Sequence, residues 1–185
     1  MPKSLQRDEW LVEMPSRKVL FQATRFAVEE VHEKLADGSS LVRNVVRHPG
    51  AVVVLPLIDA DRICLIHTYR VAIDRWNLEL PAGTLDKNLP PLEVAHLELQ
   101  EETGYRAESM VPVHTFAMSP GILDEKMHFF AASGLSPGET AREAGEQMTN
   151  VIVTWAEIDK LLRDREIIDA KTLVGLLWYM RYRTH

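Results

Sequence analysis

Residues 80–105 are the most informative part of this sequence, and they read LPAGTLDKNLPPLEVAHLELQEETGY. Toward the end of this stretch stand three closely spaced glutamates, Glu98, Glu101 and Glu102. Residues three and four apart lie on the same side of a helix, so a helix here would gather the three carboxylates. Like charges at that distance destabilise a helix unless a cation offsets them, and Mg²⁺ prefers oxygen ligands. The pattern therefore predicts a helix that holds a hard divalent cation, with an acidic, solvated helix face as the alternative.

The same stretch carries start and stop signals for this helix, which we expect over residues 91–103. Proline is tolerated at the first helical position, and Pro90-Pro91 stands where the helix would begin. Gly104 can adopt the left-handed conformation that commonly ends a helix. Three apolar residues recur at helical spacing and are predicted to form the buried stripe: Leu92, Ala95 and Leu99.

The rest of the chain alternates between apolar runs of strand length and two further helical patterns. Turn-forming residues at 37–40 separate two N-terminal strands, and the Gly-, Glu- and Ser-rich residues 133–147 are predicted to form a loop. The predicted strands are 21–33, 41–46, 51–58, 62–70, 76–80, 111–117, 126–132 and 151–155, and the two later helices are 156–164 and 169–182. Strands mixed with a few helices indicate an α/β protein built as an α/β/α sandwich.

Bulk properties limit the class of protein. The chain has 185 residues and a formal net charge of -6, without the dense basic stripe typical of nucleic-acid binders. No apolar run approaches the roughly 20 residues that span a bilayer, and the N-terminal residues lack the apolar core of a signal peptide, so we expect a cytoplasmic protein without membrane contact. The single cysteine, Cys64, lies in an apolar run and is predicted to be a buried strand residue rather than a nucleophile.

The segment 83–105 resembles the Nudix box, which runs Gly, five residues, Glu, seven residues, then Arg-Glu-aliphatic-x-Glu-Glu-x-Gly-hydrophobic. The matching positions are Gly83, Glu98, Leu99, Glu101, Glu102, Gly104 and Tyr105. Two positions depart, because Leu89 stands in place of the first Glu and Leu97 in place of the Arg. In the family that Arg pairs with a box carboxylate and orients it, so the box in this chain is degenerate.

Further short motifs are similar to those of the ADP-ribose and nucleoside-diphosphate-sugar pyrophosphatase branch of the Nudix family. They occur in the order 48–52 (HPGAV), 69–70 (YR), 78–83 (LELPAG), 119–125 (SPGILDE) and 169–172 (DAKT). The resemblance implies a Nudix-type α/β/α sandwich with a mixed sheet over residues 48–185. It also implies a small N-terminal antiparallel β-sheet in residues 1–47, which would form a homodimer interface. The implied substrate is a small nucleotide, and the implied cofactor is Mg²⁺, with Mn²⁺ as a possible substitute.

The resemblance also suggests roles for individual residues. The predicted metal ligands are Glu98, Glu101, Glu102 and the carbonyl of Ala82. The predicted substrate contacts are Arg70, Glu79, Asp124 and Glu125. The catalytic base is expected in the loop 133–147, with Glu146 as first choice, Glu143 and Glu139 as alternatives, and the box glutamate Glu101 if none of them serves.

The sequence leaves more than one function open. The leading hypothesis is metal-dependent hydrolysis of the diphosphate bond in ADP-ribose or a nucleoside-diphosphate sugar, which gives a nucleoside monophosphate and a sugar phosphate. One alternative is a nucleotide-sugar binding or sensor protein on a Nudix scaffold, with hydrolysis weakened by Leu89 and Leu97. Another is an enzyme of the same fold that acts on a dinucleoside polyphosphate or a coenzyme-A-type diphosphate.

Overall fold

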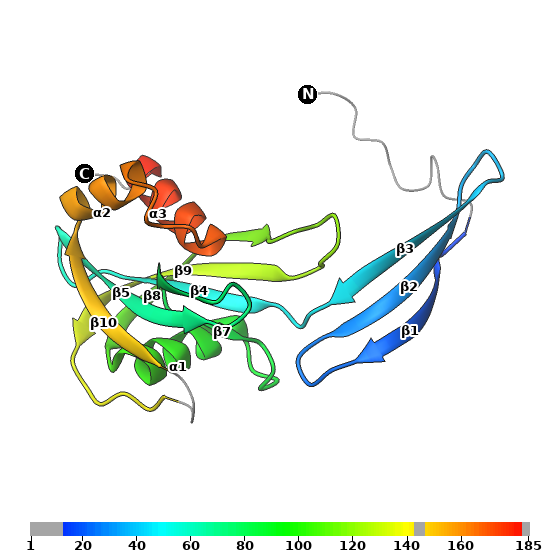
Figure 1. Ribbon diagram of the computed structural model, residues 1–185. Coiled ribbons are helices and arrows are strands. Elements are labelled where there is room, and N and C mark those ends of the chain that lie inside the picture. Colours follow the sequence, from blue (N-terminus) through cyan, green and yellow to red (C-terminus); the bar gives the residue numbers. More distant parts are fainter. Residues whose placement is uncertain (1–12, 143–146, 183–185) are drawn as a thin grey trace. The chain divides into compact units, whose positions relative to one another are not determined.

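The computed structural model describes residues 13–142 and 147–182, and these form two compact units. The first unit consists of the residues up to Pro49 together with Ser119–Glu125. Its three strands form an antiparallel sheet in chain order (Figure 1): β1 (Ser16–Gln22), β2 (Ala27–Lys34) and β3 (Ser40–Arg47). The antiparallel N-terminal sheet predicted from the sequence is therefore present.

One strand prediction in this unit was wrong. We expected a single strand over residues 21–33, but the chain turns after β1, where the Ala23 amide donates to the Phe26 carbonyl at 2.9 Å. This turn separates β1 from β2, and β1 begins earlier than the predicted strand. The second turn spans residues 35–39 and so overlaps the predicted 37–40, with Gly38 in a left-handed conformation at φ 83°.

The described part of the first unit has almost no hydrophobic core of its own. Among its described residues, Val31 is the only buried hydrophobic side chain. Every residue of β1 is exposed, and the exposed apolar side chains of the unit include Met14, Val19, Leu20, Phe21, Phe26, Val42 and Ile122. Small sheets normally need a packed apolar face to be stable, and the described residues of this sheet supply little of one.

The second unit, Gly50–Met118 with the residues from Lys126 onward, holds two further sheets and three helices. One sheet has the order β7-β4-β9-β8 and is mixed, because β4 and β9 are parallel. The other is antiparallel with the order β10-β5-β6. The strands are β4 (Ala51–Pro56), β5 (Arg62–Arg70), β6 (Arg75–Glu79), β7 (Ala82–Thr84), β8 (Arg106–Ala117), β9 (Lys126–Ser136) and β10 (Met148–Thr154).

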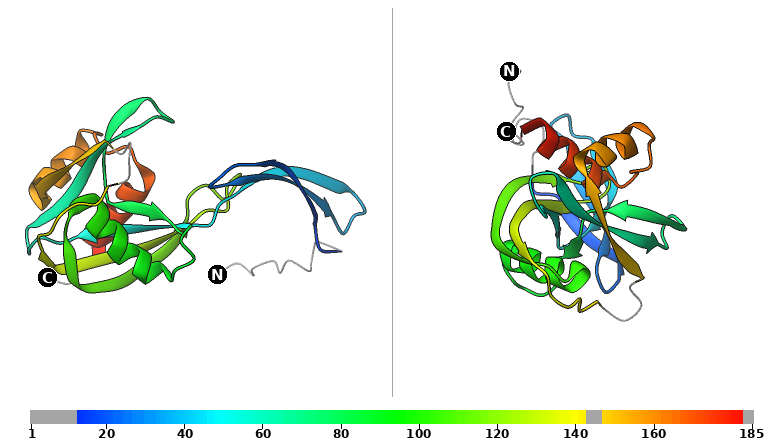
Figure 2. Two further views of the ribbon diagram at one scale, coloured as in Figure 1. Left: turned by 90° about the horizontal axis from the view of Figure 1, so that it is seen from below. Right: turned by 90° about the vertical axis from the view of Figure 1, so that its left-hand side faces the viewer.

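The helices cover both sides of these strands, as an α/β/α sandwich requires. They are α1 (Pro91–Thr103), α2 (Trp155–Arg163) and α3 (Ala170–Tyr182). Figures 1 and 2 show α1 on one side of the strands and α2 and α3 on the other. None of the described helices is both long enough and apolar enough to span a membrane.

Strand β4 lies at the centre of this arrangement and contributes to two hydrophobic cores. Alternate side chains of a strand point to opposite faces. Val52 and Val54 pack in the cluster that includes Leu99 of α1. Val53 and Leu55 belong to the second cluster, which includes residues of α2 and α3 such as Ile158 and Leu176. Burial on both faces therefore explains the apolar run over β4, which ends at Pro56, two residues before the end of the predicted strand.

Strands β8 and β9 are longer than predicted. The prediction began β8 at residue 111 and ended β9 at residue 132, but Arg106 pairs with Ser136. This long antiparallel pairing places residues 133–136 in β9, so the expected loop begins only at Pro137. The strand that follows this loop was predicted over residues 151–155. In the structure it is β10, which starts earlier, at Met148, and Trp155 already belongs to α2.

Cys64 is buried in β5, as its apolar neighbours predict. Burial raises the pKa of its thiol to about 12, because the thiolate would lose its hydration. The thiol is therefore protonated near neutral pH and cannot act as a nucleophile.

Candidate active site

The helix α1 has the predicted bounds, and its ends follow local signals. It starts at Pro91 and ends at Thr103, and Gly104 adopts φ 80° while its amide donates to the Gln100 carbonyl at 2.8 Å. The buried residues of the helix are Val94, Ala95, Leu99, Glu102 and Thr103. Leu92 was expected in the buried stripe but is 43% exposed, because the first turn of α1 is not covered by the cores that bury the later turns.

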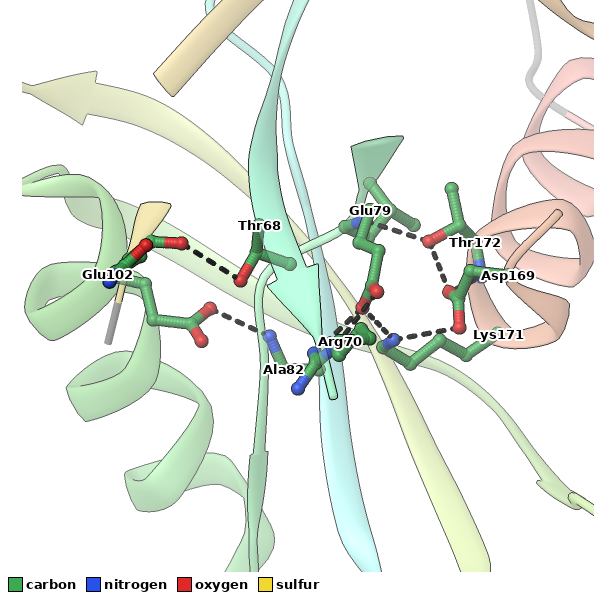
Figure 3. A network of polar contacts seen from close by, with 10 residues as sticks. Thr68, Arg70, Glu79, Ala82, Glu102, Asp169, Lys171 and Thr172 are labelled. Atoms are coloured by element: carbon green, nitrogen blue, oxygen red, sulfur yellow. Dashed lines mark hydrogen bonds and ion pairs between the residues drawn. The ribbon is translucent and has the colours of Figure 1, made fainter. Parts of the chain in front are cut away.

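The three carboxylates of α1, Glu98, Glu101 and Glu102, are named the carboxylate ridge below. Glu102 is the most buried of them at 4% exposure, and its Oε2 accepts a hydrogen bond from the Ala82 amide at 2.9 Å. Ala82 opens β7 directly after the turn that follows β6. The buried face of α1 thus carries one acidic side chain onto the first residue of β7, as Figure 3 shows for Glu102 and Ala82.

The glycine of the box is required by the position of Glu98. A Cβ atom at Gly83 would lie 2.0 Å from the Glu98 Cδ and 2.3 Å from its Oε1, far inside van der Waals contact. Gly83 therefore leaves the space that the Glu98 carboxylate occupies against β7. The contact between β7 and α1 thus brings the glycine of the box next to a glutamate that is distant from it in the sequence.

A lysine from the loop before α1 contacts the ridge. Lys87 Nζ lies 3.1 Å from Glu101 Oε2 and 3.6 Å from Glu98 Oε1. Glu98 and Glu101 share this one ammonium group, so the position between them favours a positive charge. Sequence reasoning missed Lys87, because no helical spacing links a loop residue to the ridge.

The ridge fits a divalent cation of a particular kind. Within the described residues, no group of three or more His, Cys, Asp or Glu side chains is arranged to hold a metal ion by itself. Mg²⁺ is commonly bound through one or two carboxylates, with water and substrate phosphate oxygens as the other ligands. Glu98 and Glu101 already share one cationic group, and Glu102 lies next to them on α1, so these donors suit such an ion.

A second charged group lies at the end of β5 and β6, and Figure 3 shows it beside Ala82. Arg70 donates from Nε to Glu79 Oε1 at 2.9 Å and from Nη2 to Oε2 at 2.8 Å. Lys171 Nζ also donates to Glu79 Oε2 and lies 3.0 Å from Asp169 Oδ1. We call these four residues, two cations and two carboxylates, the ion-pair cluster.

The ion-pair cluster keeps Glu79 ionised although the residue is only 1% exposed. Burial opposes ionisation, but the hydrogen bond from Arg70 and the charge and hydrogen bond of Lys171 outweigh it and lower the pKa of Glu79. The hydrogen bond to Glu79 likewise raises the pKa of Arg70 against the effect of burial. The cluster is therefore a set of mutually compensated charges.

The two predicted substrate contacts in this cluster differ in accessibility. Both carboxylate oxygens of Glu79 are engaged by protein cations, so a direct contact of Glu79 with a nucleotide stays a prediction. The Arg70 side chain is 45% exposed, and only its Nε and Nη2 donate to Glu79. Within the described part of the chain, no partner contacts Nη1, which leaves the outer edge of the guanidinium for a further acceptor.

The other two predicted substrate contacts lie in the first unit. Asp124 accepts from Arg47 Nη1 at 2.9 Å and from the His48 amide at 2.8 Å, and Glu125 Oε1 lies 3.4 Å from His48 Nδ1. Burial opposes ionisation of Asp124, but the His48 and Arg47 hydrogen bonds lower its pKa. Both acids thus hold the 119–125 loop on the end of β3, and their approach to a sugar stays a prediction.

The loop after β9 is attached to the C-terminal end of α1 by Arg142. Its Nε and Nη2 donate to the Glu102 carbonyl at 3.0 and 2.9 Å, and its Nη1 donates to the Met148 carbonyl at 2.7 Å. The last turn of α1 has no basic residue, so Arg142 supplies the positive charge that a helix C-terminus favours. Sequence reasoning missed Arg142, since forty residues separate it from Glu102.

The structure leaves the choice of catalytic base open. Glu146, the first choice, and Glu143 lie outside the described residues. Glu139 is described and exposed. The Ala141 amide donates to the Glu101 carbonyl at 3.0 Å, so the described part of this loop runs beside the end of α1.

Comparison with known proteins agrees with this geometry. A family model for the NUDIX domain matches residues 47–174. An ADP-ribose pyrophosphatase of Bacillus subtilis (strain 168) is 41% identical over 151 residues, which are 80% of this chain and 80% of that protein. A methanol dehydrogenase activator of Bacillus methanolicus is 34% identical over 157 residues, covering 84% of each.

A solved structure supports the fold. The crystal structure of an ADP compounds hydrolase superposes with a TM-score of 0.79 at 24% identity, covering 92% of this chain and 94% of that one. The family model matches more than half of the chain and includes the ridge, Gly83 and the ion-pair cluster. The chain therefore belongs to the Nudix family and is a Nudix-type hydrolase.

Proposed function

We propose that this Nudix hydrolase cleaves the diphosphate bond of ADP-ribose or a nucleoside-diphosphate sugar and releases a nucleoside monophosphate and a sugar phosphate. The observation that carries the proposal is the docking of the carboxylate ridge on the start of β7, with Glu98 against Gly83 and Glu102 bonded to Ala82. The 41% identity to an ADP-ribose pyrophosphatase supports the same substrate class.

The residues of the ridge would hold the metal. We infer Mg²⁺, or Mn²⁺ in its place, bound by Glu98, Glu101, Glu102 and the Ala82 carbonyl. Such an ion neutralises phosphate charge and makes a bound water more acidic. The ridge supplies carboxylates that are already close to one another, so little reorganisation is needed when the cation and the diphosphate arrive.

Arg70 is the proposed phosphate contact of the protein itself. A guanidinium binds two oxygens of a phosphate through parallel N–H groups. Glu79 occupies one edge of Arg70 and orients it, and the outer edge is the one proposed to face the diphosphate. Asp124 and Glu125 are proposed to act at the sugar end, and the base is proposed to be Glu146, with Glu143, Glu139 or Glu101 as alternatives.

The replacement of the box Arg by Leu97 is proposed to weaken hydrolysis less than the sequence alone indicates. In the family, the Arg at the position of Leu97 pairs with a box carboxylate. In this chain Lys87 contacts both Glu98 and Glu101 and so provides a cation to the same carboxylates. Glu98 and Glu101 therefore lie around one cation position without the Arg, and a divalent ion can displace the ammonium group from it, which favours hydrolysis over the sensor hypothesis.

We further propose that the chain is a homodimer in the cytoplasm, with residues 1–47 as a dimerisation extension of the domain 48–185. The support is the sheet β1-β2-β3, which exposes apolar side chains and buries only Val31 among its described hydrophobic residues. Light scattering should give twice the mass of one chain. Phe21→Asp in β1 should lower it, and a monomeric wild-type protein would contradict the proposal.

The hydrolase proposal is tested by turnover. Purified protein is given a panel of ADP-ribose, nucleoside-diphosphate sugars and dinucleoside polyphosphates with Mg²⁺ or Mn²⁺, and nucleoside monophosphate release is measured. The matched control is the Glu98→Gln, Glu102→Gln double variant. If no substrate is turned over faster than by this control while calorimetry shows tight binding, the sensor hypothesis replaces the hydrolase.

A further inference from the structure

We propose that Lys171 and Asp169, at the start of α3, are positioning residues that hold Arg70 for the diphosphate by acting through Glu79. The inference rests on the proposed function, since it assigns Arg70 to the phosphate. Neither Lys171 nor Asp169 contacts the outer edge of Arg70, so they are not proposed to touch the substrate.

Arg70 and Glu79 meet because β5 and β6 are neighbours in one antiparallel sheet. Pairing of Glu79 with Ile66 sets the register, and the fork of Arg70 then reaches the Glu79 carboxylate. With Arg70 as its only cationic partner, Glu79 Oε2 would accept one charged hydrogen bond and could still accept a second. Lys171 supplies that second hydrogen bond and shares Oε2 with Arg70 Nη2.

The shared oxygen is the reason for a positioning role. A carboxylate with one cationic partner can rotate about its last torsion, because such sp³–sp² torsions have broad minima. Lys171 binds Oε2 from a second direction and restricts this rotation of Glu79. Since Arg70 binds both oxygens of the same carboxylate, the plane of its guanidinium is restricted too.

Lys171 is itself held by a chain of contacts that returns to the sheet. Asp169 Oδ1 lies 3.0 Å from Lys171 Nζ, and Asp169 Oδ2 accepts from Thr172 Oγ1 at 2.6 Å. The buried Thr172 Oγ1 accepts in turn from the Leu80 amide at 2.8 Å. Leu80 lies two residues before β7, so α3 is tied to Glu79 through Lys171 (Figure 3) and, through Thr172, to the segment that leads into the strand on which the ridge docks.

The expected effect is on substrate binding more than on the chemical step. A phosphate contact whose partner is allowed to rotate loses part of its orientation, and such misplacement typically costs about tenfold or more. We expect Lys171→Met, which keeps the length of the side chain and removes its charge, to raise KM about tenfold and to change kcat less than about threefold. Lys160→Met in α2 is the matched control, since Lys160 is exposed and pairs with Asp164 on the surface; its kinetics should equal wild type.

A double-variant cycle separates positioning from general damage. Arg70→Met should raise KM at least as much as Lys171→Met, and the Arg70→Met, Lys171→Met double variant should be no worse than Arg70→Met alone. Independent, multiplying effects on KM would overturn the proposal. Asp169→Asn provides a second route if Lys171→Met does not fold, because the amide oxygen can still accept from Thr172 while its hold on Lys171 weakens, and it should raise KM several-fold.

The outcomes distinguish this inference from the proposed function. Absence of wild-type turnover above the Glu98→Gln, Glu102→Gln control would refute the hydrolase. Wild-type turnover together with unchanged KM in both Lys171→Met and Asp169→Asn would refute the positioning role alone. Circular dichroism and thermal melts of each variant establish that the kinetics are those of folded protein.

Discussion

The carboxylate ridge and the ion-pair cluster are both charged groups of the second unit, but their charges are arranged in opposite ways. The ridge comes from one helix and carries three like charges, and Lys87 of the preceding loop contacts two of them. The cluster combines β5, β6 and α3 and balances two cations with two carboxylates, with Glu79 buried at its centre. A group with an excess of negative charge attracts a further cation. A group with equal numbers of cations and carboxylates can instead hold its own side chains in place.

The largest loss of folding stability should come from removing the buried carboxylate of the ion-pair cluster. Glu79→Gln leaves Arg70 and Lys171 without the carboxylate that compensates them, and removal of one partner of a buried pair typically costs about 3–5 kcal/mol. Urea unfolding at neutral pH should show a loss of this size. The control is Glu157→Gln, a capping glutamate of α2 whose loss should cost about 1 kcal/mol.

The pH dependence of this variant gives a second test. The folded protein lowers the pKa of Glu79, so ionised Glu79 stabilises the fold above the ordinary glutamate pKa of 4.5. This contribution is lost as the pH falls through the lowered pKa of the folded state. The difference in unfolding free energy between wild type and Glu79→Gln should therefore shrink on acidification below about pH 4.5. A gap that stays constant would mean that Glu79 is not ionised in the fold.

The ridge should respond in activity rather than in stability. Glu102→Gln keeps an acceptor for the Ala82 amide but removes one carboxylate charge, so turnover with Mg²⁺ should fall at least about 100-fold. The matched control is Glu93→Gln, in the exposed first turn of the same helix. Equal activity of the two variants in a nucleoside monophosphate release assay would separate the ridge from the reaction.

The contrast between the two groups also explains what the sequence could predict. The bounds of α1 and the gathering of Glu98, Glu101 and Glu102 follow from helical spacing, Pro90-Pro91 and Gly104, all within fifteen residues. The Nudix family and the mixed-sheet sandwich were likewise predicted from motifs and confirmed. Such local patterns depend on neighbours in the chain, and a single sequence displays them.

Contacts between distant segments were not predictable in the same way. The partnership of Glu79 with Lys171 spans 92 residues, and the motif 169–172 was noted in the sequence without any indication of its partner. The extension of β8 back to Arg106 depends on a pairing with Ser136, and the exposure of Leu92 depends on how far the core extends under α1. Each of these requires the tertiary arrangement, because the local pattern is compatible with several outcomes.

A smaller loss of folding stability is expected from replacing Arg142, which links the loop after β9 to the C-terminal end of α1. Arg142→Met removes donors to the carbonyls of Glu102 and Met148 and leaves those acceptors without their charged partner. The expected loss is about 2 kcal/mol in unfolding free energy. Arg163→Met in α2, which removes an exposed pair with Asp159, should cost less than about 0.5 kcal/mol. Equal losses for the two variants would contradict the capping role of Arg142.

The smallest effect should come from Lys87, the loop lysine that contacts the ridge. Lys87 Nζ lies within 3.1 Å of Glu101 and 3.6 Å of Glu98, so a divalent ion that binds these carboxylates must displace the ammonium group. Lys87→Met should therefore bind Mn²⁺ more tightly by a few-fold, since removing a competing exposed ion pair changes the free energy by about 1 kcal/mol or less. Calorimetric titration of Mn²⁺ into the substrate-free protein measures this directly, with Lys160→Met as the variant that should match wild type. Weaker binding by Lys87→Met would instead show that the lysine arranges the ridge for the metal, and the ridge would then resemble the ion-pair cluster in being held by its own cation.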